Sequence, residues 1–187
     1  MSALAPLGGD DWLVVIDPQA IFADPATSAW GSPMFATALP RMVALAAAYG
    51  PERTILTRFV ADPGAGGSWG AYYRDWPFAL VPDDDPLYVL VPELAGAAGH
   101  VVTCATFGKW GPALRAVVGE HPRLTLAGVS TDCCVIATAL PAADAGASIR
   151  IAANACAGST RDDHEHALAV LALFAPQIVI AAMSDKS

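Results

Sequence analysis

The stretch Leu124-Thr125-Leu126-Ala127-Gly128-Val129-Ser130-Thr131-Asp132-Cys133-Cys134-Val135 predicts a strand, a tight turn and the start of a helix. Its first residues are apolar and end in a glycine, and the Ser, Thr and Asp that follow are typical helix-capping residues. Apolar residues then recur at helical spacing: Val135, Ile136, Ala139, Leu140 and Ala143. The first helical turn therefore carries two thiols, where the helix dipole lowers a thiol pKa and free N–H groups can hold an oxyanion. The alternative is that both cysteines fill core space.

The composition limits the class of protein. The 187 residues fit one domain over 1–187, and a hydrophobic content of 55% supports a sizeable core. No apolar run approaches the roughly 18–20 residues of a membrane span, and no signal peptide is recognisable at the start. The net charge is −8 with 10 Lys and Arg, which argues against nucleic acid and anionic membranes as partners. The cysteine spacing suits neither a disulfide framework nor structural zinc, so we expect a reduced, cytoplasmic protein.

Strands and helices are expected to alternate along the whole chain. Apolar runs predict strands at about 12–16, 54–57, 100–103, 124–128, 148–152 and 177–181. Helices are expected at 34–49, 92–98, 112–118, from about 131 to 146 with a kink at Pro141, and from 162 or 163 to 174. The segments 20–33, 59–85 and 154–160 are predicted to be loops.

This alternation predicts an α/β fold with a doubly wound, mostly parallel six-stranded sheet and helices on both faces. The strand order 3-2-1-4-5-6 would place the first and fourth strands side by side, where such sheets bind ligands. Asp17 follows the first strand and Cys134 follows the fourth, so we expect the two side chains to meet in one crevice. No G-x-G-x-x-G motif follows the first strand, so dinucleotide binding has no support.

The segment 59–85 is long for a loop and rich in Gly, Pro and aromatic residues. Such loops are usually functional, so we predict a pocket wall or lid. An interface between subunits is an equally good interpretation, because exposed Trp and Tyr also mark interfaces. The expected partner is a small-molecule substrate in a mainly apolar pocket. The residues predicted to line this pocket are Gln19, Phe22, Trp30, Trp69, Tyr73, Trp76, Phe107 and Trp110.

Several motifs resemble the isochorismatase-like cysteine hydrolases, a family that includes nicotinamidases and N-carbamoylsarcosine amidohydrolases. Leu13-Val14-Val15-Ile16-Asp17-Pro18-Gln19 resembles the family's strand-Asp-x-Gln opening, and 128–135 resembles its G-V-x-T-x-x-C-V nucleophile motif. The resemblance covers nearly the whole chain, through 137–139, 144–146, Ala155 and His166. It implies that Cys134, and not Cys133, is the nucleophile.

The resemblance also assigns the rest of the site. Asp17 is the implied general base and acid, and a cis peptide bond is implied between Val129 and Ser130. Backbone N–H groups near Ser130 and Cys134 would then hold the oxyanion. The family's Lys position falls on Cys104, which cannot supply a positive charge. Lys109 could substitute for it, or could be an ordinary surface lysine.

The metal-binding Asp-x-His and His set of nicotinamidases has no counterpart after the second strand, so we expect no metal and no cofactor, and nicotinamidase activity becomes unlikely. The expected reaction is hydrolysis of an amide-type C–N bond of a small molecule through a thioester on Cys134. One rival is a weakened or inactive relative that only binds a ligand, because Cys104 replaces the Lys. Further rivals are an isochorismate-type ether hydrolase, which needs no thiol, and a partner protein that uses the aromatic loop as an interface. The resemblance implies a homodimer or homotetramer.

Overall fold

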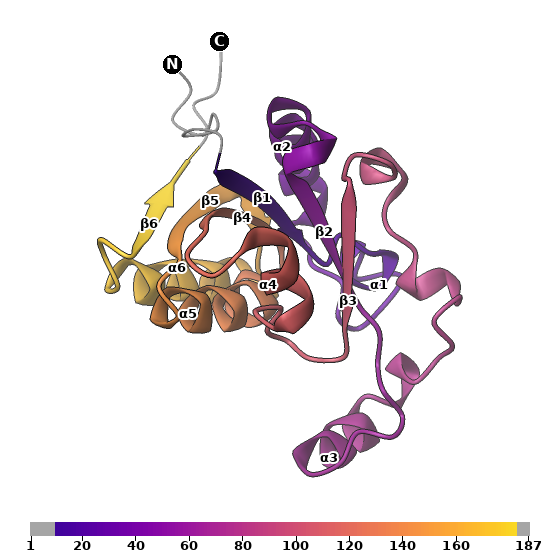
Figure 1. The fold of residues 1–187 in the computed structure, drawn as a ribbon. Helices are drawn as coiled ribbons and strands as arrows, with labels where there is room; N and C mark the ends of the chain where they lie inside the picture. The colour runs from indigo at the N-terminus through magenta and orange to yellow at the C-terminus, as the bar shows by residue number, and fades with distance from the viewer. Residues whose placement is uncertain (1–9, 183–187) are drawn as a thin grey trace.

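The computed structural model describes residues 10–182, and these contain one six-stranded sheet in which every pairing is parallel. The strand order is β3-β2-β1-β4-β5-β6, which confirms the predicted doubly wound topology (Figure 1). The strands are β1 (Asp11–Ile16), β2 (Thr54–Phe59), β3 (His100–Cys104), β4 (Arg123–Val129), β5 (Ser148–Ala157) and β6 (Ile178–Ala181).

Helices connect the strands and cover both faces of the sheet (Figure 1). The α-helices are α1 (Ala20–Ala23), α2 (Phe35–Tyr49), α3 (Ser68–Asp75), α4 (Pro112–Val118), α5 (Ile136–Asp144) and α6 (Arg161–Ala172). A π-helical turn at Thr131–Val135 precedes α5. Short 3₁₀ turns lie at Pro51–Arg53, Pro77–Ala79, Pro86–Tyr88 and Pro92–Leu94. None of the helices within residues 10–182 is long and apolar enough to cross a membrane.

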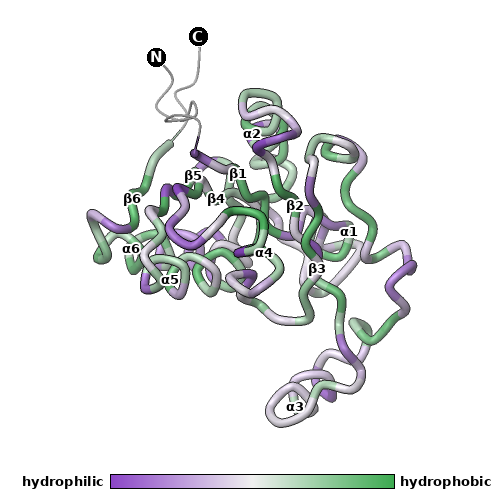
Figure 2. The backbone as a smooth tube through the Cα atoms, in the orientation of Figure 1, coloured by the Kyte–Doolittle hydropathy of each residue, from purple (hydrophilic) through white to green (hydrophobic). Residues whose placement is uncertain are grey.

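The central strand β1 separates two hydrophobic cores. Its side chains alternate between the two faces of the sheet, as strand geometry requires. Leu13 and Val15 join the core beneath α2, whereas Val14 and Ile16 join the core beneath α4, α5 and α6. All four side chains are fully buried, which explains why this strand is a continuous apolar run. Figure 2 shows the same concentration of hydrophobic residues in the central strands.

Two predicted loops contain helices. Residues 20–33 begin with α1, and the segment 59–85 contains α3, which Figure 1 shows standing away from the sheet. The sequence of α3 includes a glycine and three aromatic residues, so helix propensity is weak there. Packing holds the helix instead, because the Tyr72 ring lies 5.4 Å from Phe107 and 5.8 Å from Trp30.

Strand β5 is longer than expected. It continues through Asn154 to Ala157, part of which was predicted to be a polar loop. The pairing of β4 with β5 shifts register between Leu126 and Gly128 and then resumes with Gly128 opposite Cys156. An irregularity of this kind bends and twists a strand locally without ending it. The predicted helix at 92–98 is only the 3₁₀ turn Pro92–Leu94, which is ended by the turn into β3.

Candidate active site

Asp17 lies at the carboxyl end of β1, at the point where the order of the strands reverses. The side chain is fully buried, and its backbone has a φ of 46°, a region that non-glycine residues rarely adopt. Thr57 of the neighbouring strand β2 fixes the residue twice. The Asp17 N–H donates to Thr57 Oγ1 at 3.0 Å, and the same hydroxyl donates to Asp17 Oδ1 at 2.6 Å. Oδ1 of Asp17 is thereby hydrogen-bonded to Thr57, whereas Oδ2 makes no hydrogen bond with this hydroxyl.

Lys109 occupies the position beside that second oxygen. Its Nζ lies 2.9 Å from Asp17 Oδ2, and both side chains are fully buried. The ammonium also donates to the Thr106 carbonyl at 2.7 Å and lies 5.4 Å from the centre of the Phe59 ring. Burial disfavours the ammonium, but the charges of Asp17 and Cys134 hold the pKa of Lys109 above its usual value. The surface interpretation of Lys109 is therefore wrong.

The loop after β3 places Lys109 beside Asp17 because contacts with the start of α5 hold the loop in position. A side chain at Gly108 would come within 2.6 Å of the Ala137 carbonyl oxygen, so this close approach needs glycine. The Lys109 N–H donates to Thr138 Oγ1 at 2.9 Å. The same hydroxyl donates to the Cys134 carbonyl at 2.7 Å. Thr138 thus ties the lysine loop to the backbone that carries the thiol.

The two thiols lie on the π-helical turn that follows β4. The peptide bond between Val129 and Ser130 is cis, as the family resemblance implies. The Ser130 carbonyl accepts from the Cys133 N–H at 3.1 Å and from the Val135 N–H, five residues on, at 3.0 Å. The second bond closes a wider turn than an α-helix has, and such turns are frequent at functional sites. The sequence pattern could not distinguish this turn from a regular helix start.

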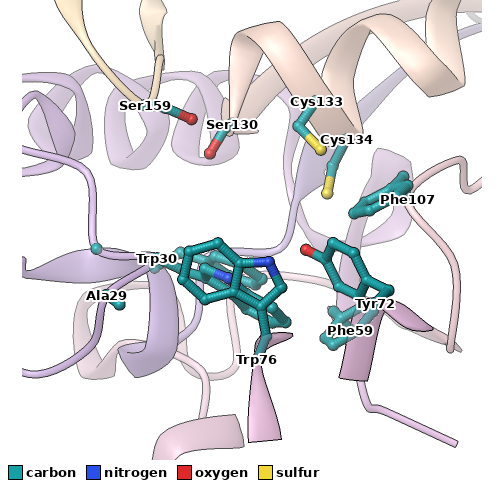
Figure 3. Close-up of a pocket in the computed structure, with 12 residues that line it drawn as sticks. Ala29, Trp30, Phe59, Tyr72, Trp76, Phe107, Ser130, Cys133, Cys134 and Ser159 are labelled. Atoms are coloured by element: carbon teal, nitrogen blue, oxygen red, sulfur yellow. The ribbon is translucent and has the colours of Figure 1, made fainter. Parts of the chain in front are cut away.

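Cys134 is buried and Cys133 is half-buried, and both sulfur atoms face the same space (Figure 3). The hydrogen bond with Cys133, burial and the nearby charge of Asp17 raise the pKa of the Cys134 thiol, and Lys109 offsets this only in part. The hydrogen bond with Cys134 lowers the pKa of the Cys133 thiol. The expectation that the helix start lowers the thiol pKa is therefore wrong for Cys134.

Cys104, at the predicted position of the cation, is the last residue of β3 and is half-buried. Burial raises the pKa of its thiol, while the charge of Lys109 lowers it and that of Asp17 raises it. The residue is thus close to the ion pair, but it does not line the pocket described next. The ammonium comes instead from Lys109, five residues further along the chain.

A cavity of about 390 Å³ opens in front of the thiols (Figure 3). Its wall is mostly aromatic, and none of its lining residues carries a charged side chain. The lining residues are Phe22, Ala29, Trp30, Gly31, Phe59, Tyr72, Trp76, Phe107, Ser130, Cys133, Cys134 and Ser159. Four of the predicted pocket residues are among them: Phe22, Trp30, Trp76 and Phe107.

The other four predicted pocket residues support the wall from behind or lie elsewhere. The buried Gln19 amide donates to the carbonyls of Phe59 and Tyr88 at 3.0 and 2.8 Å, so it anchors the 59–99 segment. Trp69 packs its ring 4.9 Å from Phe107 and stacks on the buried Tyr73 at 5.7 Å. Trp110 packs against the guanidinium of Arg115 at 5.9 Å.

Sequence reasoning missed Ala29, Gly31, Phe59, Tyr72 and Ser159 as lining residues. Tyr72 belongs to the aromatic segment that was singled out, but only the position of α3 selects it over Tyr73. Figure 3 shows its hydroxyl directed toward the two thiols, and burial together with the thiols raises the pKa of Tyr72. Ser159 is held by Asp132, which accepts from its N–H at 2.8 Å and its hydroxyl at 2.7 Å. No local pattern could have revealed that pairing.

Metal-ligating side chains do not gather at this site. Within residues 10–182, no group of three or more His, Cys, Asp or Glu side chains is arranged to hold a metal ion. The predicted absence of a metal remains a prediction.

Comparison with known proteins gives one family and a consistent fold. A family model for the isochorismatase domain matches residues 11–182. A cysteine hydrolase from Pseudomonas syringae superposes with a TM-score of 0.76 at 18% identity, over 91% of this chain and 88% of that one. A nicotinamidase from Bacillus subtilis gives 0.72 at 20% identity, over 92% and 99%. A ribonuclease from Caenorhabditis elegans gives 0.68 at 16%, over 95% and 79%. No curated sequence matches.

Proposed function

The chain belongs to the isochorismatase family, and from this premise we propose that it hydrolyses the C–N bond of a small amide through a thioester on Cys134. One observation carries the proposal. A fully buried Asp17–Lys109 ion pair, with 2.9 Å between Oδ2 and Nζ, lies beside a buried thiol at the edge of an aromatic pocket. The neighbouring structures share the fold, but their names cover different reactions, so the choice of reaction depends on the site.

In the acylation step Asp17 acts as the general base. Its Oδ1 is engaged by Thr57, whereas Oδ2 has Lys109 beside it and no other hydrogen-bond donor among the described residues. Oδ2 therefore takes the proton from the Cys134 thiol as sulfur attacks the amide carbonyl carbon.

Lys109 and the thiol-bearing turn stabilise the charges that develop. The backbone N–H groups of Ser130 and Cys134 hold the oxyanion, a contribution of about 3 kcal/mol per donor in comparable sites. The ammonium of Lys109 stabilises the carboxylate and the thiolate in turn. The intermediate then collapses, the C–N bond breaks, and the protonated Asp17 gives its proton to the amine. Asp17 then deprotonates a water molecule, whose oxygen attacks the thioester carbonyl carbon. The C–S bond breaks, the carboxylic acid leaves, and Asp17 returns the proton to the sulfur of Cys134.

The pocket favours a small, uncharged substrate with a planar or apolar group. A cavity of about 390 Å³ is within the usual range for a small-molecule site, and its lining offers aromatic rings but no charged partner. The hydroxyls of Tyr72, Ser130 and Ser159 are the polar groups available to orient the amide. The Tyr72 hydroxyl is directed toward the thiols, and we propose that it donates a hydrogen bond to the substrate there. The raised pKa of Tyr72 keeps this side chain a neutral phenol.

The alternative of a weakened or inactive relative that only binds a ligand was based on the absence of a cationic side chain at Cys104. The position of Lys109 removes that reason, because an ammonium lies beside Asp17 after all. The small-molecule partner and the homodimer or homotetramer remain proposals. The cytoplasmic location likewise remains a prediction.

A panel of neutral primary amides, assayed for ammonia release, tests the proposed function. We expect turnover of at least one aromatic or apolar amide and none of its carboxylate-bearing analogue. Cys134→Ala should abolish release, while Cys133→Ala serves as the matched control that removes the neighbouring thiol. Release that survives Cys134→Ala at the wild-type rate would refute the proposed reaction.

A further inference from the structure

Cys133 is a nucleophilic group for which the proposed mechanism has no use. It is half-buried, and it lines the same cavity as Cys134. Figure 3 shows the two sulfur atoms side by side at the end of the pocket. We propose that Cys133 and Cys134 together form a binding site for trivalent aryl arsenicals, which bridge both sulfurs inside the aromatic pocket. The inference depends on this geometry and not on the proposed function.

Two consecutive residues of the π-helical turn line the same cavity. Here the bond from the Val135 N–H to the Ser130 carbonyl widens the turn. The Cys133 N–H is bonded to the same carbonyl at 3.1 Å, and the Cys134 carbonyl is held by Thr138. The backbone that carries both thiols is therefore held in place before a ligand arrives, which reduces the entropic cost of binding it.

The binding step needs no oxidant and no further reactant. An aryl arsenoxide, R–As=O, reacts with the two thiols so that two As–S bonds form. Both S–H bonds and the As=O bond break, and the oxygen leaves as water with the two thiol protons. Arsenic stays trivalent and both sulfurs keep their oxidation state. Cys133 is half-buried whereas Cys134 is buried, so Cys133 is the more accessible sulfur for the first attack.

The pocket also selects the organic group on arsenic. The rings of Trp30, Phe59, Trp76 and Phe107 line the cavity in front of the sulfurs, so a phenyl group attached to the bridging arsenic would lie among aromatic side chains. The arsenoxide is uncharged, as is the lining of the cavity. We therefore expect a phenyl arsenical to bind more tightly than a methyl one, by about tenfold, since burying a ring adds about 1.4 kcal/mol or more.

The test uses the full reduced chain and one equivalent of phenylarsine oxide, read by native mass spectrometry, by titration of free thiols in the folded protein and by peptide mapping. We expect one phenylarsenic adduct per chain, the loss of two titratable thiols, and both lost thiols at Cys133 and Cys134. A dithiol such as 2,3-dimercaptopropanol should remove the adduct, whereas an equal concentration of thiol groups as 2-mercaptoethanol should not.

Single-residue variants test whether arsenic is bound to both Cys133 and Cys134. Cys133→Ser and Cys134→Ser should each lose the dithiol-reversible adduct, while Cys104→Ser, the matched control for a nearby half-buried thiol, should keep it. Circular dichroism checks that each variant is folded, and peptide mapping of the wild type decides the matter if one is not. An adduct that survives Cys133→Ser, that disappears in Cys104→Ser, or that fails to form on folded wild-type protein would overturn the inference.

Discussion

At the scale of single residues, the identity of the cation decides how the site works. Lys109 is the buried partner of Asp17, so its removal leaves a fully buried carboxylate without its counter-charge. Replacing Lys109 by Met, which keeps the chain length, should lower kcat/KM by about tenfold to a thousandfold, the effect of losing an opposite charge worth 1–3 pKa units. Steady-state kinetics on an amide substrate measures this. Lys186→Met, at a lysine outside the described residues, is the control for loss of a lysine. An unchanged rate in Lys109→Met would contradict the proposed role of Lys109.

For the variant Cys104→Lys we predict an effect on activity that is opposite to the one suggested by the family alignment. If it were the vacant cation position, Cys104→Lys would raise activity. Because Lys109 already lies beside Asp17, a second ammonium near it adds like-charge repulsion in a half-buried position. Cys104→Lys should therefore leave kcat/KM unchanged or lower it, and Cys104→Ser should have little effect. A clear gain of activity in Cys104→Lys would show that Lys109 does not fill the cation's role.

At the scale of elements, the site depends on the link between the loop after β3 and helix α5. Thr138 accepts from the Lys109 N–H and donates to the Cys134 carbonyl. Thr138→Val keeps the shape but leaves the buried Lys109 N–H without a partner, which costs about 1–3 kcal/mol. Chemical denaturation should show this loss in unfolding free energy, and kcat should fall because the ammonium is less well placed. Thr138→Ser is the control and should retain both properties.

Much of this arrangement could be predicted from the elements, and some could not. The buried run of β1, the glycine near the end of β4 and the alternation of strands and helices suffice to place Asp17 and Cys134 at one edge of the sheet. The place of Lys109 beside Asp17 was harder to predict. An alignment compares positions along the chain, whereas this contact depends on how far the lysine side chain can reach in the folded protein. The loop after β3 brings Lys109 to Asp17 only through contacts with α5, and these are distant in sequence.

At the scale of the whole molecule, buried acids make stability fall at alkaline pH. Burial raises the pKa of Cys156 to about 12, from an ordinary value near 9. The unfolded chain therefore loses this proton first, so the stabilisation is complete below pH 9 and is lost as the pH rises from 9 through 12. At pH 10 this one group should lower the unfolding free energy by about 1.4 kcal/mol relative to pH 7. Buried Tyr49, whose pKa is raised to about 12, adds to the decline above pH 10.

Denaturation curves at several pH values measure this decline. Cys156→Ala should be less steeply destabilised between pH 7 and 10 than the wild type, whatever its stability at pH 7, because the titrating group is gone. Cys104→Ala is the control for a half-buried thiol in the same sheet. Equal slopes in Cys156→Ala and the wild type would refute the assignment to Cys156.

The central claim is that the sulfur of Cys134 attacks the substrate carbonyl in the aromatic pocket. Its most direct test is the ¹³C NMR spectrum of the protein with an aromatic aldehyde, labelled at the carbonyl carbon, whose aldehyde group replaces the amide. Attack by a thiol converts the aldehyde signal into that of a thiohemiacetal without any turnover. We predict this signal in the wild type and in Cys133→Ala, and its loss in Cys134→Ala. A thiohemiacetal that persists in Cys134→Ala or disappears in Cys133→Ala, or a wild-type spectrum without one, would contradict the account.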